Sequence, residues 1–251
     1  MAEIRTHPNF PHIPDNISLP QFMLQYHHPL RPIRTDIACL IEDDSGRGIY
    51  FEELRNNTRT LASTLRAKYK IGENDVVMII SRNHMEYPTA LWAIHLLGGV
   101  VSCSNPQSTV EELLGQLILA KITFVIAHSS NVSMVLSAMH LAGLSSDRVI
   151  LIDRMASVPR IPNVYDCIQE GVKNNFDFQE RVFDSGEGKR KTALLSWSSG
   201  TTGKPKAVAI SHYALIANII QMTAHTQVEK AHCFRNVRGF RPGDVAIGGD
   251  Y

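Results

Sequence analysis

Short apolar runs alternate with amphipathic stretches along most of this 251-residue chain. A run that is apolar throughout suits a strand that helices cover on both faces of a sheet. Because neighbouring parallel strands need a long crossover, the amphipathic stretches between the runs predict βα units. We therefore expect an α/β fold, with helices on both faces of mostly parallel sheets. The predicted strands include VVMII (76–80), GVVSC (99–103), ITFVIA (122–127) and RVILID (148–153).

The amphipathic stretches carry helix signals. In residues 51–69, leucines recur near one helical face while arginine and lysine occupy the other. Ser108 and Thr109 each precede a glutamate by three residues, which is the spacing of a capping box and predicts a helix start. Further helices are predicted at 18–28, 87–97 and 131–142 and briefly around 165–172, a hairpin between 36–42 and 49–51, and connecting chain over most of 153–191.

The charge balance and the cysteines exclude several classes of protein. Lys and Arg number 25 against 24 for Asp and Glu, a formal net charge of +1, so we expect no nucleic-acid partner and favour a small-molecule ligand. No apolar stretch reaches the roughly 20 helical residues that span a bilayer. The four cysteines are too far apart for a zinc site or a disulfide framework. With no secretory signal visible, we expect an intracellular setting, cytoplasmic or peroxisomal.

Residues 196–208, SWSSGTTGKPKAV, are the most informative segment. The runs TALLSW before it and AVAI after it predict two strands, and Ser211 is placed to cap a helix over 212–226. Gly200 and Gly203 leave backbone N–H groups accessible to an anion, while serines and threonines add hydroxyl donors and two lysines add charge. The segment therefore predicts a loop that binds a polyphosphate.

Two familiar nucleotide motifs do not fit. The pattern G-x-x-x-x-G-K-[ST] needs a glycine where Ser198 stands and a hydroxyl residue where Pro205 stands. In G-x-G-x-x-G, the third glycine would fall at Lys191. The histidines share no metal-site spacing, so we interpret them as core or surface residues.

Composition alone would make the segment an ordinary surface loop, because Gly, Ser, Thr, Pro and Lys are the usual loop residues. Its order favours another interpretation. SSGTTGKPKAV closely resembles [ST]SGTTGxPKGV, the phosphate-binding signature of the adenylate-forming (AMP-binding) superfamily, with Ala207 where glycine is usual. That departure costs stability only if the position requires a positive φ. The resemblance continues in IYFEELRNNTRTLASTLR, LWAIHLLGGVVSCSNPQSTVEELLGQL and SHYALIANI, and it is nearest to 4-coumarate–CoA ligase-like and acyl-CoA synthetase sequences.

The resemblance implies a reaction and its participants. In that family a carboxylate attacks the α-phosphate of Mg-ATP to give an acyl adenylate and pyrophosphate, and a thiol, commonly CoA, then takes the acyl group. ATP, Mg²⁺, CoA and a small carboxylic acid are therefore the implied ligands. No catalytic residue or protein metal ligand is predicted. The implied ATP contacts are Ser198, Ser199, Gly200, Thr201, Thr202, Gly203 and Lys206, with Lys204 at a position where the signature accepts other residues.

Members of that family are much longer and continue after R-P-G-D-V with a P-x-x-H segment, an acyl pocket and a small domain that carries a catalytic lysine. Here the sequence reads FRPGDVAIGGDY. We expect residues 1–16 to be a lead-in and residues 17–251 to be an incomplete AMP-binding domain, the N-terminal portion of a carboxylate–CoA ligase. The alternative is a nucleotide-binding or interaction protein without catalysis. The two hypotheses differ in their assays: carboxylate-dependent ATP–pyrophosphate exchange would indicate a working enzyme, and ATP binding without exchange a binding protein. For the isolated chain we expect no turnover, weak ATP binding at most, and self-association through unpaired strand edges.

Overall fold

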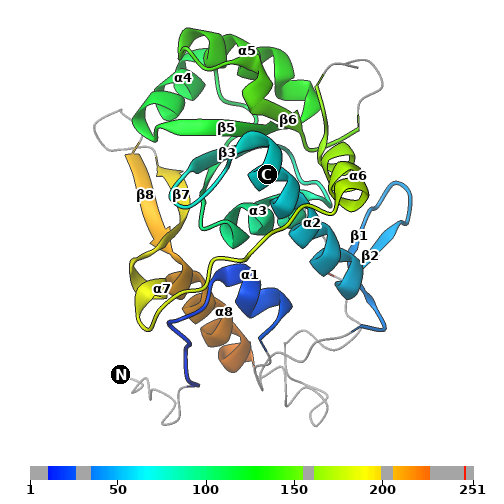
Figure 1. Cartoon of the computed structure of the whole chain (residues 1–251). Coiled ribbons are helices and arrows are strands. Elements are labelled where there is room, and N and C mark those ends of the chain that lie inside the picture. The colour runs from blue at the N-terminus through cyan, green and yellow to red at the C-terminus, as the bar shows by residue number, and fades with distance from the viewer. Residues whose placement is uncertain (1–10, 27–34, 155–160, 199–205, 227–245, 247–251) are drawn as a thin grey trace.

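A six-stranded sheet with helices on both faces forms the centre of the molecule (Figure 1). The computed structural model describes residues 11–26, 35–154, 161–198, 206–226 and 246. Five neighbouring strands are parallel and a sixth is antiparallel at one edge, which confirms the α/β class and the mostly parallel sheet. In spatial order the strands are β6 (Val149–Leu151), β5 (Ile122–Ala127), β3 (Val76–Ile80), β4 (Val100–Ser104), β7 (Thr192–Ser198) and the antiparallel β8 (Lys206–Ser211).

Two layers of helices cover the sheet, as Figure 1 shows. One face carries α2 (Phe51–Tyr69), α3 (Tyr87–Leu96) and α6 (Val164–Asn174), and the other carries α4 (Val110–Leu119) and α5 (Val132–Leu141). The alternation along β3 explains the division, since Val77 and Ile79 enter the first core and Met78 and Ile80 enter the second. Burial on both faces is the property that the apolar run 76–80 predicted.

A smaller hairpin and a third cluster flank the sheet. Strands β1 (Ala38–Ile41) and β2 (Gly48–Tyr50) pair antiparallel, as the sequence predicted. The helices α1 (Leu19–Leu24), α7 (Glu187–Arg190) and α8 (His212–Thr226) lie side by side at the end of the sheet where β7 begins (Figure 1). Leu19 and Phe22 of α1 pack there against Ile216 and Ile220 of α8.

Several local predictions are confirmed and others need correction. Thr109 Oγ1 accepts from the Glu112 N–H at 3.2 Å and the Glu112 carboxylate accepts from the Thr109 N–H, so Thr109 rather than Ser108 caps α4. The helix predicted at 18–28 ends at Leu24, α6 is longer than predicted, and the single turn α7 was not predicted. The residues of α8 that are buried are His212, Ile216 and Ile220. In the part of the chain that the structure describes, no helix is both long and apolar enough to cross a membrane.

Candidate functional site

The candidate site lies at the edge where β3, β4 and β7 end, which is where open α/β sheets bind their ligands. Ser198 ends β7, Lys206 begins β8, and the two are cross-strand partners. Both side chains are exposed. The antiparallel pairing therefore holds the two ends of the predicted phosphate loop together, because directly opposed strand residues have Cα atoms only about 5 Å apart. The other predicted contacts, Ser199, Gly200, Thr201, Thr202, Gly203 and Lys204, lie outside the described residues.

The base of the predicted loop is regular strand. Ala207, which stands where the family signature has glycine, pairs with Trp197 inside the β7–β8 ladder. It is absent from the described non-glycine residues with positive φ, so alanine is not strained there. The indole N–H of Trp197 donates to Ser102 Oγ of β4 at 3.0 Å. That hydrogen bond links the end of β7, just before the loop, to the neighbouring parallel strand β4.

A second polar group occupies the same edge of the sheet, after β3, β5 and β6. Asp153 accepts from the N–H of Ser129 at 2.8 Å and from its hydroxyl, and lies 3.7 Å from His128 Nε2. Burial opposes ionisation of Asp153, but the Ser129 hydrogen bonds outweigh it and its pKa is lowered. Burial lowers the pKa of His84 nearby. The sequence signal was polar residues within a few positions after each buried strand, which is too common in loops to be singled out.

No metal centre is formed by these groups. Within the residues that the structure describes, no three or more histidine, cysteine, aspartate or glutamate side chains are grouped so as to hold a metal ion. Glu86, at the start of α3, is buried, which raises the pKa of its carboxyl group. At the predicted phosphate loop, the described residues supply the hydroxyl of Ser198 and the ammonium group of Lys206 for an anion.

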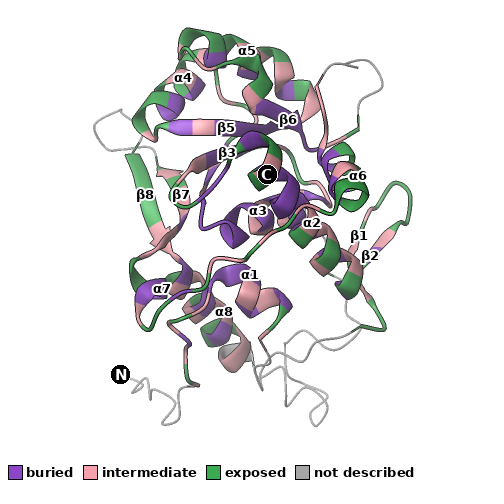
Figure 2. Cartoon of the chain, viewed as in Figure 1, coloured by how far each residue is buried: buried purple, intermediate pink, exposed green. Residues whose placement is uncertain are grey.

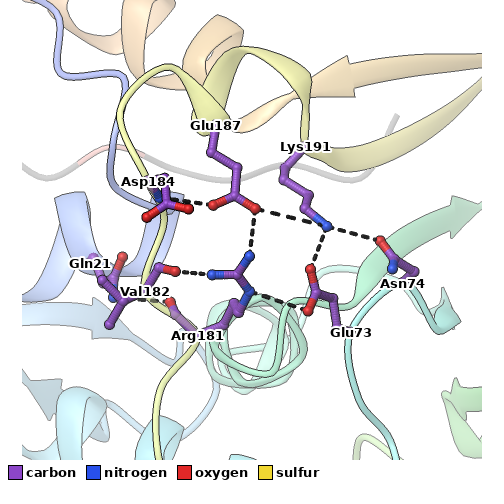
Figure 3. Close-up of polar contacts among 8 residues, drawn as sticks. All are labelled: Gln21, Glu73, Asn74, Arg181, Val182, Asp184, Glu187 and Lys191. Carbon is purple, nitrogen blue, oxygen red and sulfur yellow. Dashed lines mark hydrogen bonds and ion pairs between the residues drawn. The ribbon is translucent and has the colours of Figure 1, made fainter.

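The opposite end of the β7–β8 hairpin is fixed by a network of ion pairs, drawn in Figure 3. Arg181 contacts Glu73 at 3.3 Å and Glu187 at 2.5 Å. Lys191, the residue before β7, binds the same Glu73 carboxylate and lies 3.3 Å from the side-chain oxygen of Asn74. The hydrogen bond from Lys191 is the main cause of the lowered pKa of Glu73. This network lies at the amino end of the sheet, away from the candidate site, and is structural; sequence reasoning treated the segment 153–191 as connection and missed it.

The class of protein is defined by these features together: an open, mostly parallel α/β domain, and an edge hairpin whose strands are joined in sequence by a glycine- and hydroxyl-rich segment between Ser198 and Lys206. Residues 31–241 match the family model of the AMP-binding enzymes. Because the match covers most of the chain, the chain belongs to the AMP-binding enzyme family.

Among characterised proteins, the chain is similar to acyl-CoA and 4-coumarate–CoA ligases. It is 27% identical over 231 residues to the acyl-CoA ligase easD of Emericella nidulans, a match that covers 87% of this chain and 41% of that protein. It is 30% identical over 189 residues to 4-coumarate–CoA ligase 3 of Arabidopsis thaliana, covering 74% of this chain and 31% of the relative. The chain thus spans less than half the length of these two relatives.

Solved structures support the same fold. A long-chain-fatty-acid–CoA ligase from Archaeoglobus fulgidus superposes with a TM-score of 0.67 at 20% identity, over 90% of this chain and 43% of that one. A red-emitting luciferase from Phrixothrix hirtus gives a TM-score of 0.63 at 27% identity, over 72% of this chain and 43% of the luciferase. The described elements therefore correspond to part of the fold of adenylate-forming enzymes.

Proposed function

We propose that this chain carries the triphosphate-binding part of an AMP-forming carboxylate–CoA ligase. The main observation in support is the cross-strand pair Ser198–Lys206 at the carboxyl edge of the sheet. In the sequence, these two residues flank a segment that contains glycines, hydroxyl residues and a second lysine. Family membership and the similarity to acyl-CoA and 4-coumarate–CoA ligases support the same reading. On this proposal, residues 17–251 form the N-terminal portion of the AMP-binding domain.

The proposed chemistry of the chain's own residues is electrostatic. When a carboxylate attacks the α-phosphate of ATP, negative charge grows on the departing pyrophosphate. Backbone N–H groups of 199–204, the hydroxyl of Ser198 and the ammonium group of Lys206 would hold the β- and γ-phosphates in place and offset that charge. Lys206 is exposed and so is accessible to a phosphate. Mg²⁺, CoA and the carboxylic acid belong to the proposal through the family alone.

The test is ATP binding by the full chain, measured by isothermal titration calorimetry. Lys206→Ala removes one charge-assisted contact and should lower the affinity for Mg-ATP by about tenfold or more. The matched control is Lys173→Ala, which removes an equally charged, exposed side chain near the end of α6. Equal affinities of the Lys206→Ala chain and the unaltered chain would refute the proposed phosphate site.

A second assay separates the ligase proposal from its alternative, a nucleotide-binding protein without catalysis. Carboxylate-dependent exchange of pyrophosphate into ATP requires adenylation of an acid, whereas ATP binding does not. We expect the chain by itself to bind Mg-ATP weakly and to show no exchange. Exchange at the rate of a complete ligase would contradict the expectation of an inactive fragment.

We also propose that the chain self-associates through β8. In the described part of the sheet, β8 pairs with β7 only, and Val208 is 48% exposed. Figure 2 shows most of this strand in the exposed class. An unpaired strand edge can template pairing with another chain, and a charge on it opposes that pairing. Val208→Lys should therefore lower the mass measured by analytical ultracentrifugation; an unchanged mass above that of a monomer would rule out β8 as the contact.

A further inference from the structure

Two buried histidines meet where the β7–β8 hairpin begins. His95 lies in α3 and has no exposed surface, and His212 is the first residue of α8 and is 1% exposed. Their ring centroids are 4.8 Å apart in an edge-to-face arrangement. Phe183 packs edge-to-face against His212 from the other side, at 5.2 Å. Sequence reasoning allowed for core histidines, but it gave no reason for these two to meet.

The hydrogen-bond partners define the protonation of each ring. His95 Nε2 is 2.9 Å from the backbone oxygen of Ala193 in β7, and because a carbonyl can only accept, Nε2 carries the hydrogen. His212 Nδ1 is 3.1 Å from the backbone nitrogen of Leu19, and because an N–H can only donate, Nδ1 carries none. His212 is therefore neutral, with Nε2 protonated. A second proton on His95 would sit on Nδ1, which is buried without a hydrogen-bond partner and would leave an unpaired charge in the core, so His95 is neutral as well. Burial, the larger cause for each, lowers the pKa of His95 to about 4 and that of His212 to about 2.

Packing alone does not account for the histidine at position 95. Its Nδ1 atom is buried and lacks a hydrogen-bond partner in the described structure, which is unfavourable. A leucine would fill a similar volume without leaving an unpaired acceptor. Replacing His95 by leucine would remove the hydrogen bond from Nε2–H to the Ala193 carbonyl. That bond joins α3 to the start of β7.

Each histidine contact fixes the hairpin at the end opposite to Ser198 and Lys206. The His95 bond holds β7, while the His212 side chain joins the start of α8 to the first N–H of α1, which has no partner inside that helix. The backbone N–H of His212 also donates to the carbonyl of Lys191 at 3.2 Å. A hairpin of six or seven residues per strand is about 20 Å long, so a displacement at this end moves the far end as well.

We propose that His95 and His212 are positioning residues for the phosphate loop, a neutral histidine pair that anchors the β7–β8 hairpin to α3 and α1. The pair holds the hairpin in one orientation, so that the loop between Ser198 and Lys206 stays at the carboxyl edge of the sheet. This inference rests on the proposed function for its consequence in ATP binding, but the anchoring itself is measurable without a nucleotide.

The test uses isosteres that keep or misplace one hydrogen-bonding atom. The side-chain oxygen of asparagine lies near the position of histidine Nδ1, and the side-chain nitrogen of glutamine lies near the position of Nε2. His212→Asn therefore keeps the acceptor for the Leu19 N–H, and His95→Gln keeps the donor to the Ala193 carbonyl. In His212→Gln and His95→Asn the side-chain amide is also present, but its oxygen or nitrogen lies in the wrong position to make the bond. Phe183→Leu is the control, because it removes ring packing against His212 without removing a hydrogen bond.

The primary readout is amide hydrogen exchange of the full chain, followed by mass spectrometry. We expect His212→Gln and His95→Asn to speed exchange in residues 192–198 and 206–211 by roughly tenfold or more, with β3 and β5 unchanged. His212→Asn and His95→Gln should retain the exchange rates of the unaltered chain. Phe183→Leu should raise exchange over the whole sheet rather than in the hairpin alone. The proposal would be overturned if the Asn and Gln variants at each position had equal exchange rates in the hairpin. It would also be overturned if the exchange rates rose evenly over the whole sheet.

Binding of Mg-ATP is the second readout and separates this inference from the proposed function. Failure of the unaltered chain to bind Mg-ATP refutes the proposed function, and the exchange pattern still decides whether the pair anchors the hairpin. If the unaltered chain binds, His212→Gln should lower the affinity by about fivefold or more while His212→Asn does not. Unchanged affinity in a variant whose hairpin exchanges faster would refute the positioning role.

Discussion

The neutral histidine pair predicts a specific dependence of stability on pH. Unfolding exposes both rings to water, where the ordinary histidine pKa is 6.5, while in the folded chain the pKa values are about 4 for His95 and about 2 for His212. Above pH 6.5 neither state binds these protons, so the pair has no effect on the pH slope. Below pH 6.5 the unfolded state binds protons that the folded state rejects, and the free energy of unfolding falls as the pH falls.

The magnitude follows from the same shifts. Each histidine that stays neutral in the folded state costs about 1.4 kcal/mol per pH unit below 6.5. Between pH 7.5 and pH 5, two histidines together lower the free energy of unfolding by about 4 kcal/mol. Because a domain is typically stable by about 5–15 kcal/mol, this loss is a large share of the total.

The assay is urea unfolding followed by tryptophan fluorescence at several pH values from 7.5 to about 5. The comparison chain is His95→Gln with His212→Asn, which keeps both hydrogen bonds and removes both titrating groups. Carboxylates with lowered pKa values, such as Glu73, titrate below this window, and the raised pKa of Glu86 is common to both chains. We expect the unaltered chain to lose about 4 kcal/mol more than the comparison chain. Parallel pH profiles would refute the assignment of a neutral, buried pair.

Four further substitutions test the packing and capping. Gly171→Ala should destabilise the chain by about 1–3 kcal/mol in urea unfolding, because a Cβ there would lie 2.9 Å from the Thr60 carbonyl oxygen; an unchanged midpoint would contradict the close contact of α6 with α2. Gly115→Ala, in α4 with nothing within 4 Å of the new Cβ, should instead stabilise by about 0.5–1 kcal/mol. Thr109→Ala should cost about 1 kcal/mol, whereas Ser108→Ala should cost much less, and equal effects in thermal unfolding would show that the cap is assigned to the wrong residue.

Much of the fold was predictable because its signals are local. The apolar run 76–80 has no polar face, so it predicted a strand covered on both sides, and β3 is such a strand. The capping-box spacing placed the start of α4 to within one residue. The order of residues in 196–208 indicated the AMP-binding family, which the family match confirms, although the ATP contacts in that segment stay predictions.

The sequence by itself determined which segments form strands and helices, because hydrophobic periodicity and capping depend on residues within a few positions of one another. Only the tertiary structure decided that β3 lies between β5 and β4, that β8 turns back antiparallel at the edge, and that His95 meets His212. It likewise joined Lys191 to Glu73 across the sequence (Figure 3). These contacts depend on how distant elements pack on a common core, and no local pattern in the chain specifies which distant partner each surface will find.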